Sequence, residues 1–456
     1  MEFSPERLSD ALGDCLGRLS RPVRGLCVAL SGGLDSTVLL AALARIRRDG
    51  RSTVLRAVHV DHGLHADSQR WAEACAALAA SLQVPFELER ADARPAPGES
   101  PEAAARRVRY AALARRLGAD EVLLTAHHAD DQLETVLLQW LRGGGLRAVA
   151  GMPRVAGFAA GWHARPLLEF PRIELEAWAE RCGLGWLEDP SNLDLRFDRN
   201  YLRHEVMPVI RRRWPAAART VGRVAGQAAE ALEAEGAVAE ADLESLGAGA
   251  TLSLESLRSL PDARQRWALR AWLRRRGLPV PSASTLAALQ HDMLEAAGDR
   301  IPCVSWPGVR VYRYRNMIHA ERPESHADEL VPSEWTVGSQ LDLGSLGRLE
   351  LRYAVGRGLS QARLPADLHV RRRARGEMFR PAGSSVRRPL RKWLQERGVL
   401  PWWRDRLPLV VAGDEIVAIG DLGYGAAFCA APGEPSWQIV WHGRPQLTVS
   451  EPPAGD

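Results

Sequence analysis

Six residues near the start of the chain have the types and spacing of a phosphate-binding loop. They run Ser31-Gly32-Gly33-Leu34-Asp35-Ser36, between a short apolar stretch, 26–30, and a stretch of helical composition, 37–45. Glycines let a backbone approach a ligand closely, and the N–H groups at a helix start attract anions. Asp35 would repel a phosphate unless a cation such as Mg²⁺ lay between them. The loop therefore predicts a nucleotide site with Asp35 as metal ligand; a plain turn capped by Asp35 or Ser36 is the alternative.

A second group of polar residues runs from His127 to Glu134 and contains three carboxylates. On a helix, Asp131 and Glu134 would share one face, and His127 could lean over that face. Asp130 stands where a helix cap would, so it needs no further role. Acids beside a nucleotide suit Mg²⁺ or the ammonium group of a substrate, and His127 suits general acid–base work.

Three arginines and one aspartate complete the candidate site. Arg106 and Arg109 lie three apart on a predicted helix and would share one side of it. Arg203 opens a later helix and could face the same cleft. These arginines either neutralise phosphate or are surface charge. Asp61 begins a turn that we expect beside the nucleotide; a metal site built from His59, His62 and His65 is not favoured, because His59 lies within a predicted strand.

Alternating strands and helices are predicted to position these residues. The expected strands are 26–30, 54–60, 85–89 and 121–126, and the expected helices are 5–19, 37–45, 68–82, 101–117, 130–141 and 171–182. Repeated βα units indicate an α/β fold, with a parallel sheet that has helices on both faces. Ligands bind at the carboxyl ends of such strands, which is where the candidate residues fall.

The rest of the chain is predicted to form two further domains. A long helix, 219–246, leads to a mainly helical region followed by short strands at 301–321, and a β-rich region starts near Trp335. We expect a first domain over 1–215, a connector helix and mainly helical domain over 216–325, and a small β-rich C-terminal domain over 335–445.

The charge of the chain is uneven. The net charge is +4, but residues 361–410 contain 13 Arg and Lys against four Asp and Glu, a net +9 that leaves about −5 elsewhere. Such a basic face suggests a polyanion partner, although a solvated Arg-rich surface explains it equally well. The six scattered cysteines, the absence of a signal peptide and the short apolar runs favour a cytoplasmic protein without a membrane contact.

The loop alone resembles the pyrophosphate loop of the N-type ATP pyrophosphatases, and six further motifs narrow the resemblance. Together they are similar to the tRNA(Ile)-lysidine synthetase family, strongly over about the first 215 residues and loosely beyond. The seven motifs, in order, are SGGLDS (31–36), HVDHGL (59–64), EAAARRVRY (102–110), HHADDQLET (127–135), RPLL (165–168), EDPSN (188–192) and RNYLR (199–203).

The resemblance implies an ATP-dependent ligase that acts on an isoleucine tRNA with a CAU anticodon. The wobble cytidine would be adenylated at C2, with release of pyrophosphate, and L-lysine would then displace AMP to give lysidine. The implied cofactors are ATP and Mg²⁺, and a homodimer is left open. The implied nucleotide ligands are Ser31, Gly32, Gly33, Leu34, Asp35, Ser36, Asp61, Arg109 and Arg203, with Asp35 on the metal; the implied catalytic residues are Asp35, His127, Asp131, Glu134 and Arg106.

Two departures and three rival functions qualify the resemblance. Arg107 replaces an expected acid, and His65 stands where Arg is usual; neither position is assigned to chemistry. The rivals are a tRNA thiolase of the same ATP-pyrophosphatase class, a synthetase fed by a glutaminase, and an inactive RNA-binding protein. The thiolase would need catalytic or cluster-binding cysteines near the site, the synthetase would not need a basic C-terminal domain, and the intact motifs disfavour the third.

Overall fold

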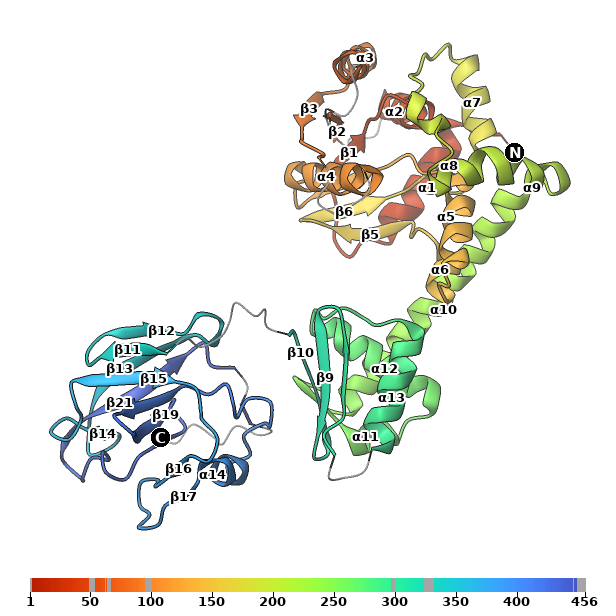
Figure 1. Cartoon of the computed structure of the whole chain (residues 1–456). Helices are drawn as coiled ribbons and strands as arrows, with labels where there is room; N and C mark the ends of the chain where they lie inside the picture. Colours follow the sequence, from red (N-terminus) through yellow and green to blue (C-terminus); the bar gives the residue numbers. More distant parts are fainter. Residues whose placement is uncertain are drawn as a thin grey trace. The chain divides into compact units, whose positions relative to one another are not determined.

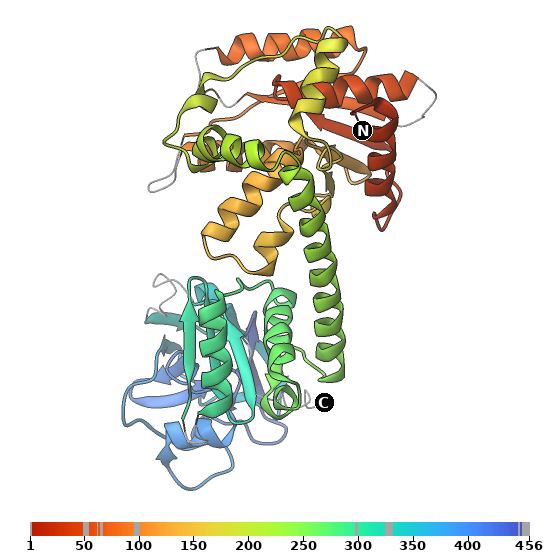
Figure 2. The ribbon, with the colours of Figure 1, turned by 90° about the vertical axis from the view of Figure 1, so that its right-hand side faces the viewer.

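The computed structural model describes residues 2–48, 54–61, 63, 67–94, 101–296, 300–323, 332–445 and 447–448. The chain divides into two compact units, Met1–Ala237 and Val238–Asp456. Helix α10 (Ala217–Ser245) crosses this boundary as one continuous helix (Figure 2). The division into three domains stays a prediction.

A six-stranded sheet forms the centre of the first unit, in the order β3-β2-β1-β4-β6-β5 (Figure 1). All neighbouring strands pair in parallel except β5, which pairs antiparallel with β6. The sequence predicted four of the strands and missed the β5–β6 hairpin. The strands are β1 (Gly25–Ala29), β2 (Val54–Asp61), β3 (Phe86–Arg90), β4 (Glu121–Leu124), β5 (Val155–Phe158) and β6 (Gly161–Ala164).

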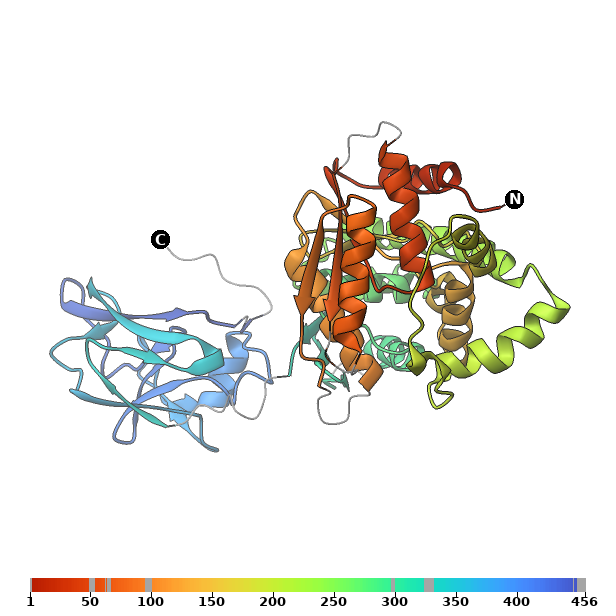
Figure 3. The ribbon, with the colours of Figure 1, turned by 90° about the horizontal axis from the view of Figure 1, so that it is seen from above.

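Helices cover both faces of this sheet, as predicted (Figure 3). Alternate residues of a strand point to opposite faces. In β1, Val28 belongs to a core shared with α1, α2, α3 and α7, whereas Cys27 belongs to a core shared with α4. These helices are α1 (Pro5–Gly17), α2 (Leu34–Arg48), α3 (Ser68–Ser81), α4 (Pro101–Arg116) and α7 (Arg172–Arg181). From the sequence, Ser100 is expected to cap α4 as its N-cap, and this residue lies outside the described residues.

Helix α5 (Ala129–Leu141) follows β4 and begins with a capping box. His128 is the N-cap: its side chain accepts the N–H of Asp131, and the carboxylate of Asp131 accepts the N–H of His128 in return. The cap is therefore His128 and not Asp130, and the side chain of Asp131 is fixed at the start of the helix.

Short helical segments connect α5 to the end of the first unit. They are α6 (Leu146–Ala150), a 3₁₀ turn (Pro190–Leu193), α8 (Asp198–Tyr201), a π-helical turn (Leu202–Val206) and α9 (Met207–Arg213). The π-helical turn carries Arg203, and α8 carries Arg199. Since π turns are rare and concentrate at functional sites, this one marks Arg203 for attention.

The second unit contains two kinds of sheet. An antiparallel sheet, β7-β10-β9-β8, packs with α11 (Leu254–Arg258), α12 (Asp262–Arg275) and α13 (Ala283–Glu295). Its strands are β7 (Thr251–Ser253), β8 (Cys303–Trp306), β9 (Val309–Tyr314) and β10 (Met317–Glu321). The sequence predicted a mainly helical region between 246 and 301, so β7 is a correction: it is short, and only its pairing with β10 makes it a strand.

The C-terminal part of this unit is β-rich, as predicted. Its sheets run β11-β15-β18-β19-β20, β12-β13-β21-β14 and β16-β17, and α14 (Leu390–Glu396) packs beside the last. The strands are β11 (Ser333–Thr336), β12 (Gln340–Asp342), β13 (Arg348–Val355), β14 (Leu359–Ser360), β15 (Asp367–Arg371), β16 (Met378–Phe379), β17 (Arg388–Pro389), β18 (Leu409–Ala412), β19 (Glu415–Ile419), β20 (Gly423–Tyr424) and β21 (Pro435–His442). Trp393 and Trp403 are buried in its core, so neither is exposed for stacking on a base.

Candidate nucleotide and ligand site

A cavity of about 350 Å³ opens at the carboxyl ends of β1, β2 and β4. It lies where the order of strands in an open parallel sheet favours ligand binding. Eight of the residues singled out from the sequence line it: Ser31, Gly33, Asp35, Ser36, Asp61, Arg109, His127 and Asp131. Gly32, Leu34, Arg106, Glu134 and Arg203 are not among its lining residues.

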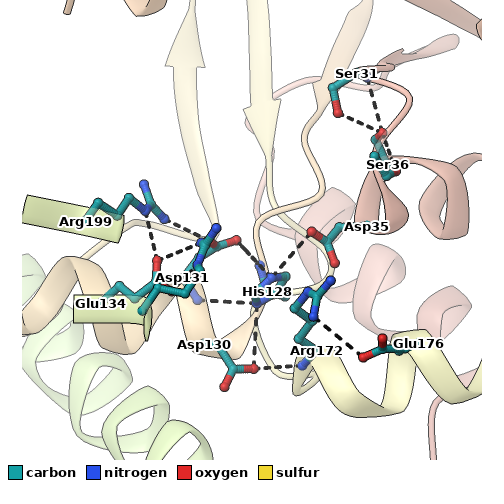
Figure 4. A network of polar contacts seen from close by, with 12 residues as sticks. Ser31, Asp35, Ser36, His128, Asp130, Asp131, Glu134, Arg172, Glu176 and Arg199 are labelled. Carbon is teal, nitrogen blue, oxygen red and sulfur yellow. Dashed lines mark hydrogen bonds and ion pairs between the residues drawn. The ribbon is translucent and has the colours of Figure 1, made fainter. Parts of the chain in front are cut away.

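The predicted phosphate loop is held closed by its own hydroxyl groups (Figure 4). The N–H of Ser31 donates to Ser36 Oγ at 3.2 Å, the two Oγ atoms are 3.0 Å apart, and Ser36 Oγ donates to the carbonyl of Gly33 at 3.1 Å. The turn leads directly into α2, so its free N–H groups and the helix dipole favour an anion at this point.

Gly32 is required by both the backbone and its surroundings. Its φ is +86°, and a Cβ there would lie 2.8 Å from Leu187 Cδ1 and 3.0 Å from Cys75 Sγ. Leu187 also donates its N–H to the carbonyl of Gly32 at 2.9 Å. Leu187, in the segment that leads to the EDPSN motif, thus holds the phosphate loop in place through its contacts with Gly32. Gly33 is less constrained, because a Cβ there would have ordinary contacts, Ser31 Oγ at 3.7 Å and the carbonyl of Leu187 at 3.9 Å.

Asp35 has a carboxylate oxygen that suits a cation. Its Oδ1 is buried and has no hydrogen-bond partner, and the side chain lines the cavity. Among the described residues, no group of three or more His, Cys, Asp or Glu side chains could hold a metal alone. One carboxylate together with phosphate oxygens and water is the way Mg²⁺ is usually held beside a nucleotide. The site therefore fits Mg²⁺ bound jointly by Asp35 and a nucleotide.

His128 lies between the carboxylate of Asp35 and the carboxylates of α5 (Figure 4). It is buried, with Nε2 3.6 Å from Asp35 Oδ2 and 3.5 Å from Asp131 Oδ2. Burial alone would lower the pKa of His128, but the charges of Asp131 and Asp35 outweigh it and raise that pKa above its usual range. His128 therefore connects the two halves of the site electrostatically, a role that sequence reasoning did not assign to it.

Asp131 and Glu134 are both buried, and two arginines bind them. Arg199 contacts Asp131 Oδ1 at 2.8 Å and Glu134 Oε2 at 2.9 Å. Arg203 contacts Asp131 Oδ1 at 3.1 Å, Glu134 Oε1 at 2.8 Å and Glu134 Oε2 at 2.9 Å. Burial would raise the pKa of Asp131, but His128 and Arg199 hold it below its usual range. Each carboxylate is thus paired with both arginines.

The structure gives Asp130 a purely structural position. Its carboxylate accepts the N–H of Arg172, at the start of α7, at 2.7 Å, and it forms an ion pair with Arg211 at 2.7 Å. Asp130 therefore links α5, α7 and α9. The sequence separated Asp130 from Asp131 and Glu134, but it predicted a helix cap at this position.

Of the remaining candidates, Asp61 lines the cavity, whereas Arg106 and Arg203 do not. Asp61 accepts the N–H of Gly63 at 2.9 Å, and the exposed Arg106 has its guanidinium 4.9 Å from the centre of the Tyr110 ring. His59 is buried and its Nδ1 lies 2.8 Å from the carbonyl of Leu30; His62 and His65 lie outside the described residues. Arg203 faces acids here, and its predicted role on phosphate stays a prediction.

Arg199 and His128 are the site residues that sequence reasoning missed. Arg199 and Arg203 are four apart, a spacing that places two side chains on one side of a helix. That spacing could have revealed Arg199, because the RNYLR motif contains both arginines. No comparable signal pointed to His128, since its neighbour Asp35 is far away in the sequence.

Three family models match successive parts of the chain. A PP-loop domain matches residues 6–210, a TilS substrate binding domain matches 252–319, and a TilS substrate C-terminal domain matches 368–441. The first contains the phosphate loop and the acids of α5, and the third contains most of the basic segment.

Curated relatives align with nearly the whole chain. The tRNA(Ile)-lysidine synthase of Alkalilimnicola ehrlichii is 43% identical over 95% of this chain and 96% of its own length. That of Methylococcus capsulatus is 39% identical, covering 91% and 95%, and that of Coxiella burnetii is 36% identical, covering 96% of each.

Proposed function

Since this chain belongs to the tRNA(Ile)-lysidine synthase family, we propose that it ligates L-lysine to C2 of the wobble cytidine in the CAU anticodon of an isoleucine tRNA. ATP supplies the energy through an adenylated tRNA, with release of pyrophosphate and then AMP. The observation that carries the proposal is the closeness of two unlike groups. The phosphate loop with Asp35 lies on one side of His128, and the paired acids of α5 lie on the other.

The phosphate loop serves the first half of the reaction. The N–H groups at the start of α2 would bind the phosphates of ATP, and Asp35 would hold Mg²⁺, which would supply neutralisation of phosphate charge. Ser31, Ser36 and Arg109 line the same cavity, and the guanidinium of Arg109 can donate hydrogen bonds to phosphate oxygens. The exocyclic oxygen on C2 of cytidine becomes a good leaving group only once it carries AMP, so this step has to come first.

The acids of α5 serve the second half. Asp131 and Glu134 are buried carboxylates that already bind cations, Arg199 and Arg203. The lysine side chain reaches the same oxygens with its ammonium group, which must then lose a proton before it attacks. A carboxylate beside the amine can accept that proton. L-lysine and Mg²⁺ are thus parts of the proposed reaction, and the homodimer stays a prediction.

One incubation tests the function. The protein, ATP, Mg²⁺ and labelled lysine are mixed with transcripts of isoleucine tRNA that differ only in the anticodon, CAU or GAU. We expect label on the CAU transcript alone and AMP release that depends on it. AMP release without either tRNA, or transfer of sulfur from a sulfur donor to the tRNA, would contradict the proposal and favour the rival synthetase or the thiolase. None of the described residues that line the cavity is a cysteine, which disfavours the thiolase.

The phosphate loop should tolerate alanine at Gly33 better than at Gly32. Gly32→Ala places a side chain in left-handed backbone and against Leu187, so we expect the KM for ATP to rise about 10-fold or more. Gly33→Ala, the matched control, should change that KM much less. Steady-state release of pyrophosphate measures both, and equal effects of the two variants would contradict the geometry.

The basic segment 361–410 should contribute to tRNA binding through side chains that are exposed. Arg371 and Arg373 form ion pairs with Glu377 and Asp405, so they are poor test positions. Exposed residues in the same segment are Arg375, Arg391 and Lys392. We expect their triple replacement by Gln to weaken tRNA binding and reduce the slope of log K against log salt by about 2.

Exposed arginines outside the segment provide the control for this measurement. Replacement of Arg18, Arg24 and Arg348 by Gln removes the same charge from other surfaces. An equal change of the slope in both triple variants would show a non-specific charge effect.

No helix in the described part of the chain is long and apolar enough to cross a membrane.

A further inference from the structure

A chain of hydrogen bonds reaches from the interior of the first unit to His127 at the cavity. Thr125 Oγ1 lies 2.8 Å from His127 Nδ1 and 2.8 Å from His163 Nε2. His163 Nδ1 lies 3.2 Å from Arg165 Nη2, and the other terminal nitrogen of Arg165 donates to the carbonyl of Pro153 at 2.7 Å. The chain starts from a buried arginine and ends at the ligand cavity.

The direction of every hydrogen bond in this chain follows from the arginine. A guanidinium only donates, so His163 Nδ1 must accept and its ring proton must lie on Nε2. That proton is donated to Thr125 Oγ1, and the hydroxyl proton of Thr125 is donated to His127 Nδ1. If Oγ1 instead accepted from both rings, the hydroxyl proton of Thr125, a residue only 6% exposed, would have no acceptor among the described residues. His127 Nδ1 is an acceptor, and its ring proton must lie on Nε2.

The opposite direction of the Thr125–His163 hydrogen bond, in which Thr125 donates, is excluded by the donors and acceptors that Arg165 and His163 possess. If Thr125 donated to His163, the ring proton of His163 would move to Nδ1, where it would face an N–H of Arg165. A doubly protonated His163 would create the same conflict. Burial is the main cause that lowers the pKa of both His127 and His163 to about 3, so each ring is neutral and carries one proton.

We propose that Arg165, His163 and Thr125 are positioning residues that lock His127 as the Nε2–H tautomer, so that His127 donates a hydrogen bond to an anionic oxygen in the cavity. The proton on Nε2 occupies the only ring nitrogen that Thr125 leaves available to a ligand. His127 in this form cannot take a proton from the lysine ammonium, because Nε2 has no lone pair to receive it. The general-base role predicted for His127 is therefore replaced by a donor role on a nucleotide phosphate. This part rests on the proposed function, whereas the tautomer does not.

The tautomer can be read directly by nuclear magnetic resonance. In the full-length protein labelled with ¹⁵N-histidine, long-range ¹H–¹⁵N correlations distinguish a protonated ring nitrogen from a bare one, and comparison with His127→Asn assigns the signal. We expect His127 with Nε2 protonated and Nδ1 bare. A wild-type spectrum with Nδ1 protonated, or with both tautomers, would overturn the proposal.

Two matched pairs of variants test the chain itself. Thr125→Ser keeps the hydroxyl and should rescue the wild-type tautomer, whereas Thr125→Val removes it and should release His127 into a mixture. His163→Gln offers an amide N–H near the position of Nε2 and should keep the tautomer. His163→Glu, of similar size, offers only acceptors, so Thr125 should donate inward and the proton of His127 should move to Nδ1. Identical spectra from Val and Ser, or from Gln and Glu, would overturn the proposal.

Adenylation kinetics test the donor role separately. With the CAU transcript and no lysine, we expect Thr125→Val to lower the rate of AMP transfer about 10- to 100-fold, because an oriented hydrogen bond to a charged oxygen is lost. Thr125→Ser should restore the rate, and the KM for lysine should stay unchanged in both. A rise of the KM for lysine with unchanged AMP transfer would overturn the donor role. If wild-type protein neither adenylates the tRNA nor transfers lysine, the proposed function fails while the spectra still decide the tautomer.

Discussion

Asp35→Asn should reduce AMP transfer to tRNA about 1,000-fold, a loss of about 4 kcal/mol of transition-state stabilisation. The physical reason is the buried Oδ1 of Asp35, which has no hydrogen-bond partner within the described chain and lines the cavity next to the phosphate loop. Asparagine keeps the shape but removes the negative charge that attracts Mg²⁺. Lysine transfer should fall equally, since it depends on the adenylated tRNA.

Labelled ATP measures this loss as AMP attached to the CAU transcript at several Mg²⁺ concentrations. The variant should need more Mg²⁺ than wild type, and pre-adenylated tRNA should partly restore lysine transfer. Asp10→Asn, an exposed change on α1, is the control and should behave as wild type. Adenylation within about tenfold of wild type in Asp35→Asn would exclude a central role for this carboxylate.

Glu134→Gln should separate the two halves of the reaction. We expect AMP transfer to change less than about threefold, while lysine transfer falls about 100-fold or more, because one of the two buried carboxylates for the ammonium loses its charge. The same change leaves Arg199 and Arg203 with a single acid, Asp131, so a lower melting temperature is also expected.

The measurement follows the adenylated tRNA, which should accumulate in Glu134→Gln even when lysine is present. High lysine concentrations should recover part of the rate if the loss is in binding. Glu176→Gln removes a carboxylate paired with Arg172 on the surface of α7 and is the matched control. An equal loss of adenylation and lysine transfer in Glu134→Gln would refute the division of labour between Asp35 and Glu134.

The sequence predicted those parts of the site that are local in the chain. The phosphate loop and the face shared by Asp131 and Glu134 depend on neighbouring residues and helical spacing, so the order of residues alone reveals both. The pairing of Asp131 with Arg199, the approach of His128 to Asp35 and the link from Arg165 to His127 depend on contacts between distant segments. No local pattern encodes those distances.

The same distinction explains the errors in the fold. Strands β1, β2 and β4 are largely buried and were found, whereas β5 and β6 each have a glycine within four residues and β7 has only three residues. Such short segments become strands through their partners, since their own composition gives no periodic signal. Asp130 was expected to cap its own helix, but the helix already had His128, and Asp130 binds the start of α7 instead.

The pairing of Asp131 and Glu134 with Arg199 and Arg203 has a consequence for the choice between amino acids. In the proposed reaction, an ammonium that binds these acids would arrive by exchange, displacing for example the guanidinium of Arg203, which already contacts both oxygens of Glu134. Free arginine would replace one guanidinium with another of the same kind and gain little, whereas the smaller ammonium of lysine fits a different geometry. Arg199 and Arg203 would thus compete with free arginine for Asp131 and Glu134, and this competition would disfavour arginine relative to lysine.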